Sequence, residues 1–163
     1  MKKIASLALA IYLACPLSAQ TIANMKDLTA GQKAAATSVK LTGTLSIRGN
    51  SDIRQLRDLC WQLKHVDLST ANCPTLPANA FHSRHRLVSV VLPANLKSIG
   101  NQAFFACDAL KQLTLPTTLE EVGAAAFSGC SSLESIAIEG TPRLGGFAFR
   151  GCNNLRSIKL LSK

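Results

Sequence analysis

Cysteine and histidine are the residues of this sequence that could bind a metal ion. Two of each follow one another between positions 60 and 85, as Cys60, Cys73, His82 and His85. Structural zinc sites usually place two cysteines two to four residues apart and two histidines three to five residues apart. Here twelve residues separate the cysteines and only two separate the histidines. The spacing does not predict a metal site, and we expect His82 and His85 to be solvated loop residues.

Motifs for catalysis are missing from the sequence as well. It contains no G-x-S-x-G nucleophile turn, no H-E-x-x-H zinc motif and no glycine-rich phosphate loop. Its carboxylates do not pair in a way that suggests acid and base roles. We therefore predict no catalytic residue, no metal and no cofactor, and a protein that is not an enzyme.

Three other cysteines, Cys107, Cys130 and Cys152, recur at a nearly constant step. Because cysteine behaves as a small buried hydrophobe, we expect these three to stack in an internal column. With Cys60 and Cys73 they make five cysteines beyond Ala19, an odd number that leaves at least one thiol unpaired. A disulfide between Cys60 and Cys73 is the alternative to free thiols.

These cysteines belong to a block of sequence that recurs down the second half of the chain. Aligned on the dipeptide Ala-Phe, the copies place phenylalanine at steps of 23, 23 and 22, as Phe81, Phe104, Phe127 and Phe149. The leucines that follow keep the same steps, as Leu87, Leu110, Leu133 and Leu155. Self-similarity at this period, built on L-x-x-L-x-L, is the signature of a leucine-rich repeat solenoid.

Each repeat predicts the same succession of elements. The phrase L-x-x-L-x-L predicts parallel strands at 63–68, 87–92, 110–115, 133–138 and 155–160. A Leu-Pro pair ends the strand, and Ile99-Gly100 and its equivalent Val122-Gly123 predict a second short extended piece and a turn. Ala103-Phe104-x-x-Cys107 then predicts a tight helical turn with a buried phenylalanine. The expected fold is an α/β repeat, a leucine-rich repeat solenoid with parallel strands on the concave face and short helical turns on the convex face.

The third and fifth residues of each strand should point outward, while the leucines point into the core. The ligand-binding candidates on the concave face are therefore His65, Asp67, Ser89, Val91, Gln112, Thr114, Ser135, Ser157 and Lys159. This face lacks the aromatic and arginine anchors of tight interfaces, so a plain solvated sheet is the alternative.

The residues before the repeats divide into three parts. Residues 1–19 form a predicted signal peptide, and 20–38 a polar segment in which Thr29 could cap a helix through Ala36. Residues 39–62 predict an N-terminal cap, with a strand at 39–47 and a helix from Ser51 or Asp52. We expect Trp61 to seal the core there, and one helix face to carry Ile53, Leu56, Leu59, Cys60 and Leu63. Four full repeats and a partial one fill 63–163.

Export is indicated by the start of the chain, residues 1–19. Lys2 and Lys3 precede an apolar run of ten residues, and Leu17-Ser18-Ala19 supplies a cleavage site. The run is too short for a transmembrane helix, so we predict a secreted, periplasmic or outer-surface protein without a transmembrane segment. Lipid anchoring at Cys15 is the alternative. Cleavage would leave 16 basic against 9 acidic residues, a net charge of +7.

The repeated phrase itself resembles a known family. The phrase L-P-x-x-L-x-x-I-G-x-x-A-F-x-x-C-x-x-L is similar to BspA-like leucine-rich repeats. It runs from Leu92 to Leu110 and again, with Val122 in place of isoleucine, from Leu115 to Leu133. The resemblance covers about residues 39–160. It implies a secreted or surface-exposed bacterial binding protein, with some relatives acting as adhesins for host matrix proteins or other bacteria.

A basic cluster, Arg84, His85 and Arg86, precedes the strand at 87–92. It is either a solvated loop or, with the positive net charge, a site for an acidic glycan, lipid head groups or an acidic protein. The expected partner is thus a host or bacterial surface protein or an acidic glycan, and not nucleic acid. A structural role is the alternative, with weak self-association through residues 155–163, where no polar capping unit follows the last strand.

Overall fold

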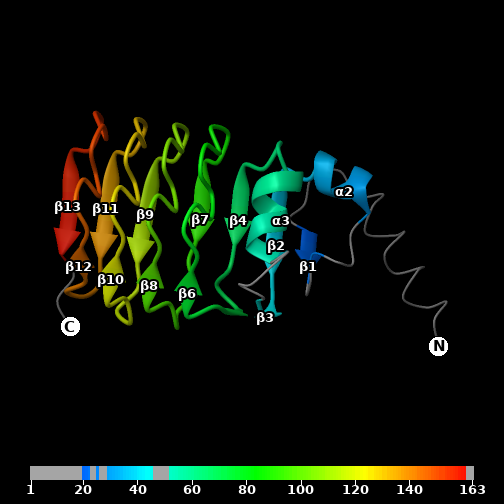
Figure 1. The fold of residues 1–163 in the computed structure, drawn as a ribbon, viewed down its shortest axis with the longest axis horizontal. Coiled ribbons are helices and arrows are strands. Elements are labelled where there is room, and N and C mark those ends of the chain that lie inside the picture. Colours follow the sequence, from blue (N-terminus) through cyan, green and yellow to red (C-terminus); the bar gives the residue numbers. More distant parts are fainter. Residues whose placement is uncertain (1–19, 23–24, 26–28, 46–51, 161–163) are drawn as a thin grey trace.

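Short parallel strands, stacked turn upon turn, wind the chain into a solenoid of about five turns (Figure 1). The computed structural model describes residues 20–22, 25, 29–45 and 52–160. The predicted signal peptide, with Cys15, therefore lies outside the described residues. The same holds for Ile47, for Ser51 as a helix cap and for residues 161–163 of the segment expected to self-associate.

One strand of each repeat comes from the phrase L-x-x-L-x-L. These strands are β4 (His65–Asp67), β7 (Ser89–Val91), β9 (Gln112–Leu115), β11 (Ser135–Ile138) and β13 (Ser157–Leu160). They match the five predicted strands, each starting two residues later than predicted. β4 pairs with β7, and β11 pairs with both β9 and β13, all in parallel. We call the exposed side of these five strands the long-strand face.

The five strands belong to two hydrogen-bonded sheets, one with β4 and β7 and one with β9, β11 and β13. Each turn then enters a further parallel sheet, which we call the second sheet, as the Ile-Gly and Val-Gly pairs predicted. Its strands have two residues each and neighbour one another in the order β6 (Thr75–Leu76), β8 (Ser98–Ile99), β10 (Glu121–Val122) and β12 (Arg143–Leu144). The glycine after a strand donates its N–H to the preceding turn, as Gly100 does to the Leu76 carbonyl at 2.8 Å. Neighbouring turns are thus joined by backbone hydrogen bonds on two sides of the solenoid.

The predicted helical turns on the convex side are wrong, because this part of each repeat is a series of hydrogen-bonded turns. Gln102 and Ala106 have φ values of 55° and 53°, and left-handed residues cannot continue a right-handed helix. Their N–H groups instead donate to the next turn, to the Ala124 carbonyl at 3.0 Å and the Ser128 carbonyl at 2.9 Å. The N–H groups between them, of Ala103 and Phe105, donate within the turn to carbonyls three residues earlier, so bonds between turns alternate with bonds within one.

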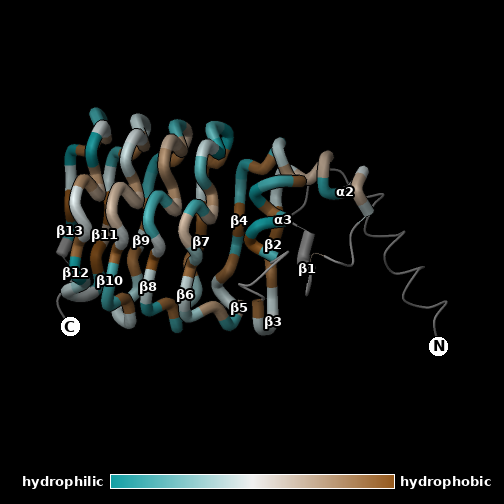
Figure 2. Tube along the Cα trace, viewed as in Figure 1, coloured by the Kyte–Doolittle hydropathy of each residue, from teal (hydrophilic) through white to brown (hydrophobic). Residues whose placement is uncertain are grey.

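The core consists of columns of identical residues, and hydrophobic positions recur from turn to turn (Figure 2). Phe81, Phe104 and Phe127 are fully buried, and their rings stack on one another and on Phe149 with centroids 5.2–5.4 Å apart. This confirms the predicted phenylalanine filler. A fully buried phenylalanine contributes roughly 1.5–3 kcal/mol of hydrophobic stabilisation, so the column is a main source of stability.

The predicted cysteine column is confirmed too. The Sγ atom of Cys107 donates to the Phe81 carbonyl, and those of Cys130 and Cys152 donate to the carbonyls of Phe104 and Phe127, each at 3.1 Å. Burial raises the pKa of the Cys107 thiol to about 12 and that of Cys60 to about 11. Cys60 and Cys73 are buried free thiols and form no disulfide with each other. Cys60, Cys73 and Cys107, whose pKa values burial raises, therefore fill space as neutral thiols.

The N-terminal part extends the long-strand sheet. β1 (Gln20–Ile22), which the sequence does not predict, pairs with β2 (Ser38–Leu41), and β2 pairs with β4. The helix predicted at 29–36 is α2 (Ala30–Ala35). The single strand predicted at 39–47 is wrong: Gly43, with φ at 74°, turns the chain into a separate strand, β3 (Gly43–Thr44), which pairs with β5 (Ala71–Asn72).

The helix predicted after Ser51 or Asp52 is α3 (Asp52–Leu59). Ile53, Leu56, Cys60 and Leu63 are buried as expected. Two expectations are wrong, because Leu59 is 43% exposed and Trp61 is 55% exposed. Leu59 is the last residue of α3, and Trp61 lies in the turn that follows, between the buried residues Cys60 and Leu63. Trp61 therefore does not seal the core.

Candidate functional site

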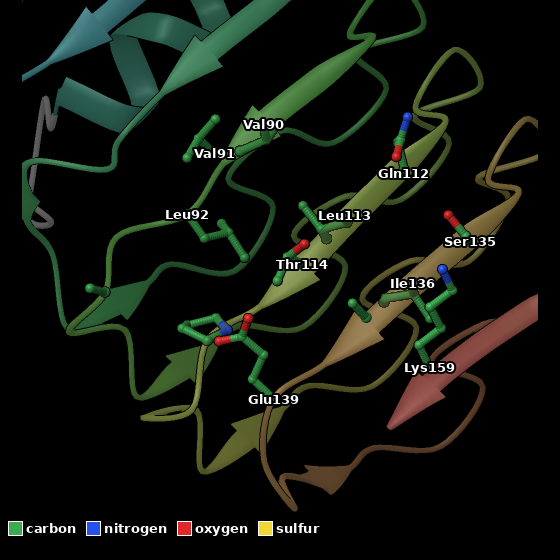
Figure 3. Close-up of a pocket in the computed structure, with 13 residues that line it drawn as sticks. Val90, Val91, Leu92, Gln112, Leu113, Thr114, Ser135, Ile136, Glu139 and Lys159 are labelled. Carbon is green, nitrogen blue, oxygen red and sulfur yellow. The ribbon is translucent and has the colours of Figure 1, made fainter. Parts of the chain in front are cut away.

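A hollow of about 450 Å³ opens on the long-strand face (Figure 3). Buried Val90, Leu113 and Ile136 form its apolar floor. Gln112 and Thr114 project from β9, and Ser135 and Lys159 project from the two following strands. Because side chains alternate along a strand, the residues between the leucines come together on one surface. The hollow thus brings together five of the nine predicted candidates: Val91, Gln112, Thr114, Ser135 and Lys159.

Opposite charges meet at the rim of this hollow. Lys159 of β13 and Glu139, which follows β11, both line it (Figure 3). Glu139 is absent from the sequence-based candidates because it lies after the strand. The sequence feature that could have revealed it is the segment Ile138-Glu139-Gly140-Thr141-Pro142, which replaces the Leu-Pro turn of the two preceding repeats. The site can therefore offer an apolar floor, neutral hydrogen-bonding groups and one charge of each sign.

The other four candidates do not line the hollow. His65 Nδ1 lies 2.8 Å from Ser89 Oγ, and Asp67 forms an ion pair with Lys40 at 3.0 Å. Burial alone would raise the pKa of Asp67, but hydrogen bonds from Ser69 and Lys40 outweigh it and hold the pKa below its usual value. Ser157 begins β13 outside the hollow. The β4 end of the long-strand face therefore has its polar groups partly engaged within the chain.

The three residues of the basic cluster have different partners. His85 Nδ1 lies 2.7 Å from Asp108 Oδ2, and Arg86 donates to Gln62 Oε1 at 3.4 Å. Arg84 instead lines a second hollow beside α3. The cluster is continuous in sequence, but its side chains do not form one patch. Arg57 of α3, which also lines that second hollow, is a site residue that the sequence does not reveal.

The histidines that raised the zinc question are held by other contacts. His82 stacks on Phe105 with ring centroids 4.9 Å apart and is half-buried, so the expectation of a solvated histidine is wrong at this position. His85 is exposed, as expected. Within the described ranges, no three side chains among His, Cys, Asp and Glu come together to hold a metal ion. No helix in the described part of the chain is both long and apolar enough to cross a bilayer.

Comparison with known proteins gives a match to one family model, described as a BspA type leucine rich repeat region. Six copies of that repeat match residues 58–163. No match was found among curated proteins. The match begins within α3 and includes every strand from β4 onward.

Two solved structures are similar to the chain. A leucine-rich repeat protein of T. pallidum has a TM-score of 0.62 at 26% identity, over 91% of this chain and 66% of that one. A leucine-rich repeat protein of Bacteroides ovatus has a TM-score of 0.54 at 30% identity, over 74% of this chain and 34% of that one. The chain thus spans two thirds or less of the length of either protein.

Proposed function

Because this chain belongs to the BspA-type leucine-rich repeat family, we propose that it is an exported binding protein whose long-strand face recognises a partner protein at or outside the bacterial surface. Leucine-rich repeat folds generally serve as scaffolds for binding and not for catalysis. The observation that carries the proposal is the hollow over β7, β9, β11 and β13, where an apolar floor is surrounded by polar groups. Export rests on the sequence features of residues 1–19.

The composition of the hollow favours a protein ligand. Apolar residues such as Val91, which is 49% exposed, offer surface that a partner's side chains can cover. Gln112, Thr114 and Ser135 add hydrogen-bonding groups, and Lys159 and Glu139 can pair with either sign of charge. Interfaces of this kind combine a desolvated apolar centre with a polar rim. An adhesive role towards host matrix proteins or other bacteria is the form of recognition that we propose.

The first prediction is that Thr114→Arg weakens binding to any protein partner at least about tenfold, because the new side chain fills the middle of the hollow. Purified host matrix proteins and bacterial surface proteins are screened by surface plasmon resonance, and the variant is then compared with the wild type on each hit. Thr114 is exposed, so the substitution should change stability by no more than about 0.5 kcal/mol.

Glu121→Arg on β10 is the matched control. It introduces the same side chain at an exposed position of the second sheet, and it should leave the affinity unchanged. Equal binding by the wild type and Thr114→Arg would exclude the hollow as the site. An equal loss of affinity in both variants would show that the added positive charge, and not the filling of the hollow, weakens binding.

A second candidate function is assembly, which the exposed apolar residues of the last described turn favour. Leu144, Phe147 and Ile158 are 51%, 72% and 53% exposed. Large apolar side chains exposed near one another mark interaction surfaces more often than isolated ones do. In this alternative, another copy of the chain or a larger surface protein covers this turn.

The second prediction belongs to this alternative: the sedimentation coefficient of the wild type should rise with protein concentration. Ile158→Lys should abolish the rise, because a charge replaces exposed apolar surface on β13. Glu121→Arg again serves as the control and should behave like the wild type. A concentration-independent monomer would eliminate self-association through this turn.

A further inference from the structure

A polar hollow of about 450 Å³ lies where α3 meets the turn of the first repeat. It is lined by Arg57, Asp58, Asn79, His82, Ser83 and Arg84. None of these residues lines the hollow on the long-strand face. The hollow contains two guanidinium groups and one carboxylate, so its lining carries an excess of positive charge.

The carboxylate is already committed to one of the two arginines. Arg57 donates to Asp58 through Nε at 2.6 Å and through Nη2 at 3.1 Å, in a bidentate pair. Its remaining group, Nη1, donates to the Asn79 carbonyl at 3.0 Å. The hydrogen bonds from Arg57 hold the pKa of Asp58 below its usual value, so the carboxylate stays ionised. The charges of Arg57 and Asp58 therefore cancel each other.

Arg84 is left without a comparable partner. Its Nε is buried and has no hydrogen-bond acceptor among the described residues. Buried donors in folded proteins nearly always find an acceptor, and one that does not calls for an explanation such as a missing ion. Arg84 as a whole is half-buried, and its side chain lines the hollow. An acceptor that enters the hollow could reach the part of the Arg84 side chain that lines it, while Nε lies below the surface.

The neighbouring polar groups are held in place. The His82 ring is stacked on Phe105, and its Nδ1 lies 2.9 Å from Ser83 Oγ. Ser83 itself is fixed by its N–H, which donates to the Phe105 carbonyl at 2.7 Å. Binding sites whose polar groups are already ordered lose less entropy when a ligand arrives. Arg84 thus faces a preformed polar hollow.

We propose that this hollow is an oxyanion-binding site in which Arg84 is the principal cation. The ligand is a sulfate, phosphate or carboxylate group, because the planar guanidinium fork matches two oxygens of such a group. It would neutralise the charge of Arg84, since the hydrogen bonds of Asp58 go to Arg57. The volume exceeds that of one such group, so there is room for part of a molecule that carries it.

The third prediction is a calorimetric titration of the purified chain with sodium sulfate, sodium phosphate and a sulfated disaccharide, at constant ionic strength set with sodium chloride. We expect one-to-one binding of at least one titrant. Arg84→Gln should weaken it about tenfold or more, because a charge-assisted pair of hydrogen bonds is lost. Tighter binding of the disaccharide than of sulfate would indicate an oxyanion carried by a saccharide, and equal affinities would indicate the free ion.

Arg86→Gln is the control, since Arg86 is exposed two residues away and does not line the hollow. Arg86→Gln should bind the titrant like the wild type. An equal loss of affinity in both variants would show that the titrant is attracted by the positive charge of the surface in general and not bound at this site. The proposal is overturned if no titrant binds the wild type or if Arg84→Gln binds equally well. If Arg84→Gln does not fold, modification of wild-type arginines with phenylglyoxal decides: the titrant should protect Arg84 and not Arg86, and equal modification with and without it would overturn the site.

Discussion

Replacing Phe104 or Phe127 with alanine should lower the free energy of unfolding by about 3–5 kcal/mol, the usual cost of truncating a buried phenylalanine. Both rings are fully buried, and each stacks between two others in the column. The cavity cannot close easily, because the backbone of each turn is bonded to the next. The Phe104 N–H, for example, donates to the Ala126 carbonyl at 2.7 Å. Unfolding in urea, followed by circular dichroism, measures the loss.

Two other phenylalanines provide controls for this fourth prediction. Phe149 is only partly buried and stacks on Phe127 alone among the described rings, so its truncation should cost less than that of Phe104. Phe147 is 72% exposed, and Phe147→Ala should cost the least. Losses below about 1 kcal/mol at both Phe104 and Phe127 would show that the column does not hold the turns together.

Gly123→Ala should destabilise the protein by about 3 kcal/mol, at the upper end of the usual cost of overpacking. A Cβ on Gly123 would lie 2.5 Å from the Asn101 nitrogen and 2.7 Å from the Gly100 carbonyl carbon. Both are backbone atoms of the preceding turn, so no side-chain rotation can relieve the contact. The Gly123 N–H also donates to the Ile99 carbonyl at 2.8 Å, which fixes the spacing of the two turns. Urea unfolding again gives the measurement.

Gly146→Ala is the matched control for this fifth prediction. Apart from Gly146 and its two chain neighbours, no heavy atom of the described residues lies within 4 Å of the position that its Cβ would take. Alanine at such a site usually stabilises slightly, by about 0.4–1 kcal/mol, because it restricts the unfolded chain. Similar losses in the two variants would mean that close approach of the turns is not what requires glycine at position 123.

The repeat architecture could be predicted because it depends on register alone. The nearly constant step of the repeat puts identical side chains on neighbouring turns, so Phe104 follows Phe81 and Cys130 follows Cys107 in space as in sequence. Strand alternation then predicted the outward residues of β9 and β11, and with them the polar groups in the middle of the hollow on the long-strand face. A structure built from a repeated local pattern can be predicted without knowing which distant residues are in contact.

The misses have a different origin. Ala106 adopts a left-handed conformation, which is uncommon for alanine. The sequence therefore offered no reason to reject a helical turn at this position. The prediction that Trp61 seals the core rests on its place in the cap segment, but Trp61 lies in a turn after α3 and is exposed. The polar hollow joins Arg57 and Arg84, which belong to an element outside the repeats and to a turn within them. No periodic pattern connects such residues.

The strand register has a genetic consequence. From β4 to β13, paired strand residues lie 22 to 24 positions apart in sequence, and each turn bonds only to its neighbours. Excising the codons for residues 100–122 would place Gly123 directly after Ile99, in the position that Gly100 now occupies. The hollow over β9 would shrink, while the joined turns would keep equivalent neighbours. Recombination within such a gene can therefore change the extent of the binding surface in whole units while leaving the fold intact.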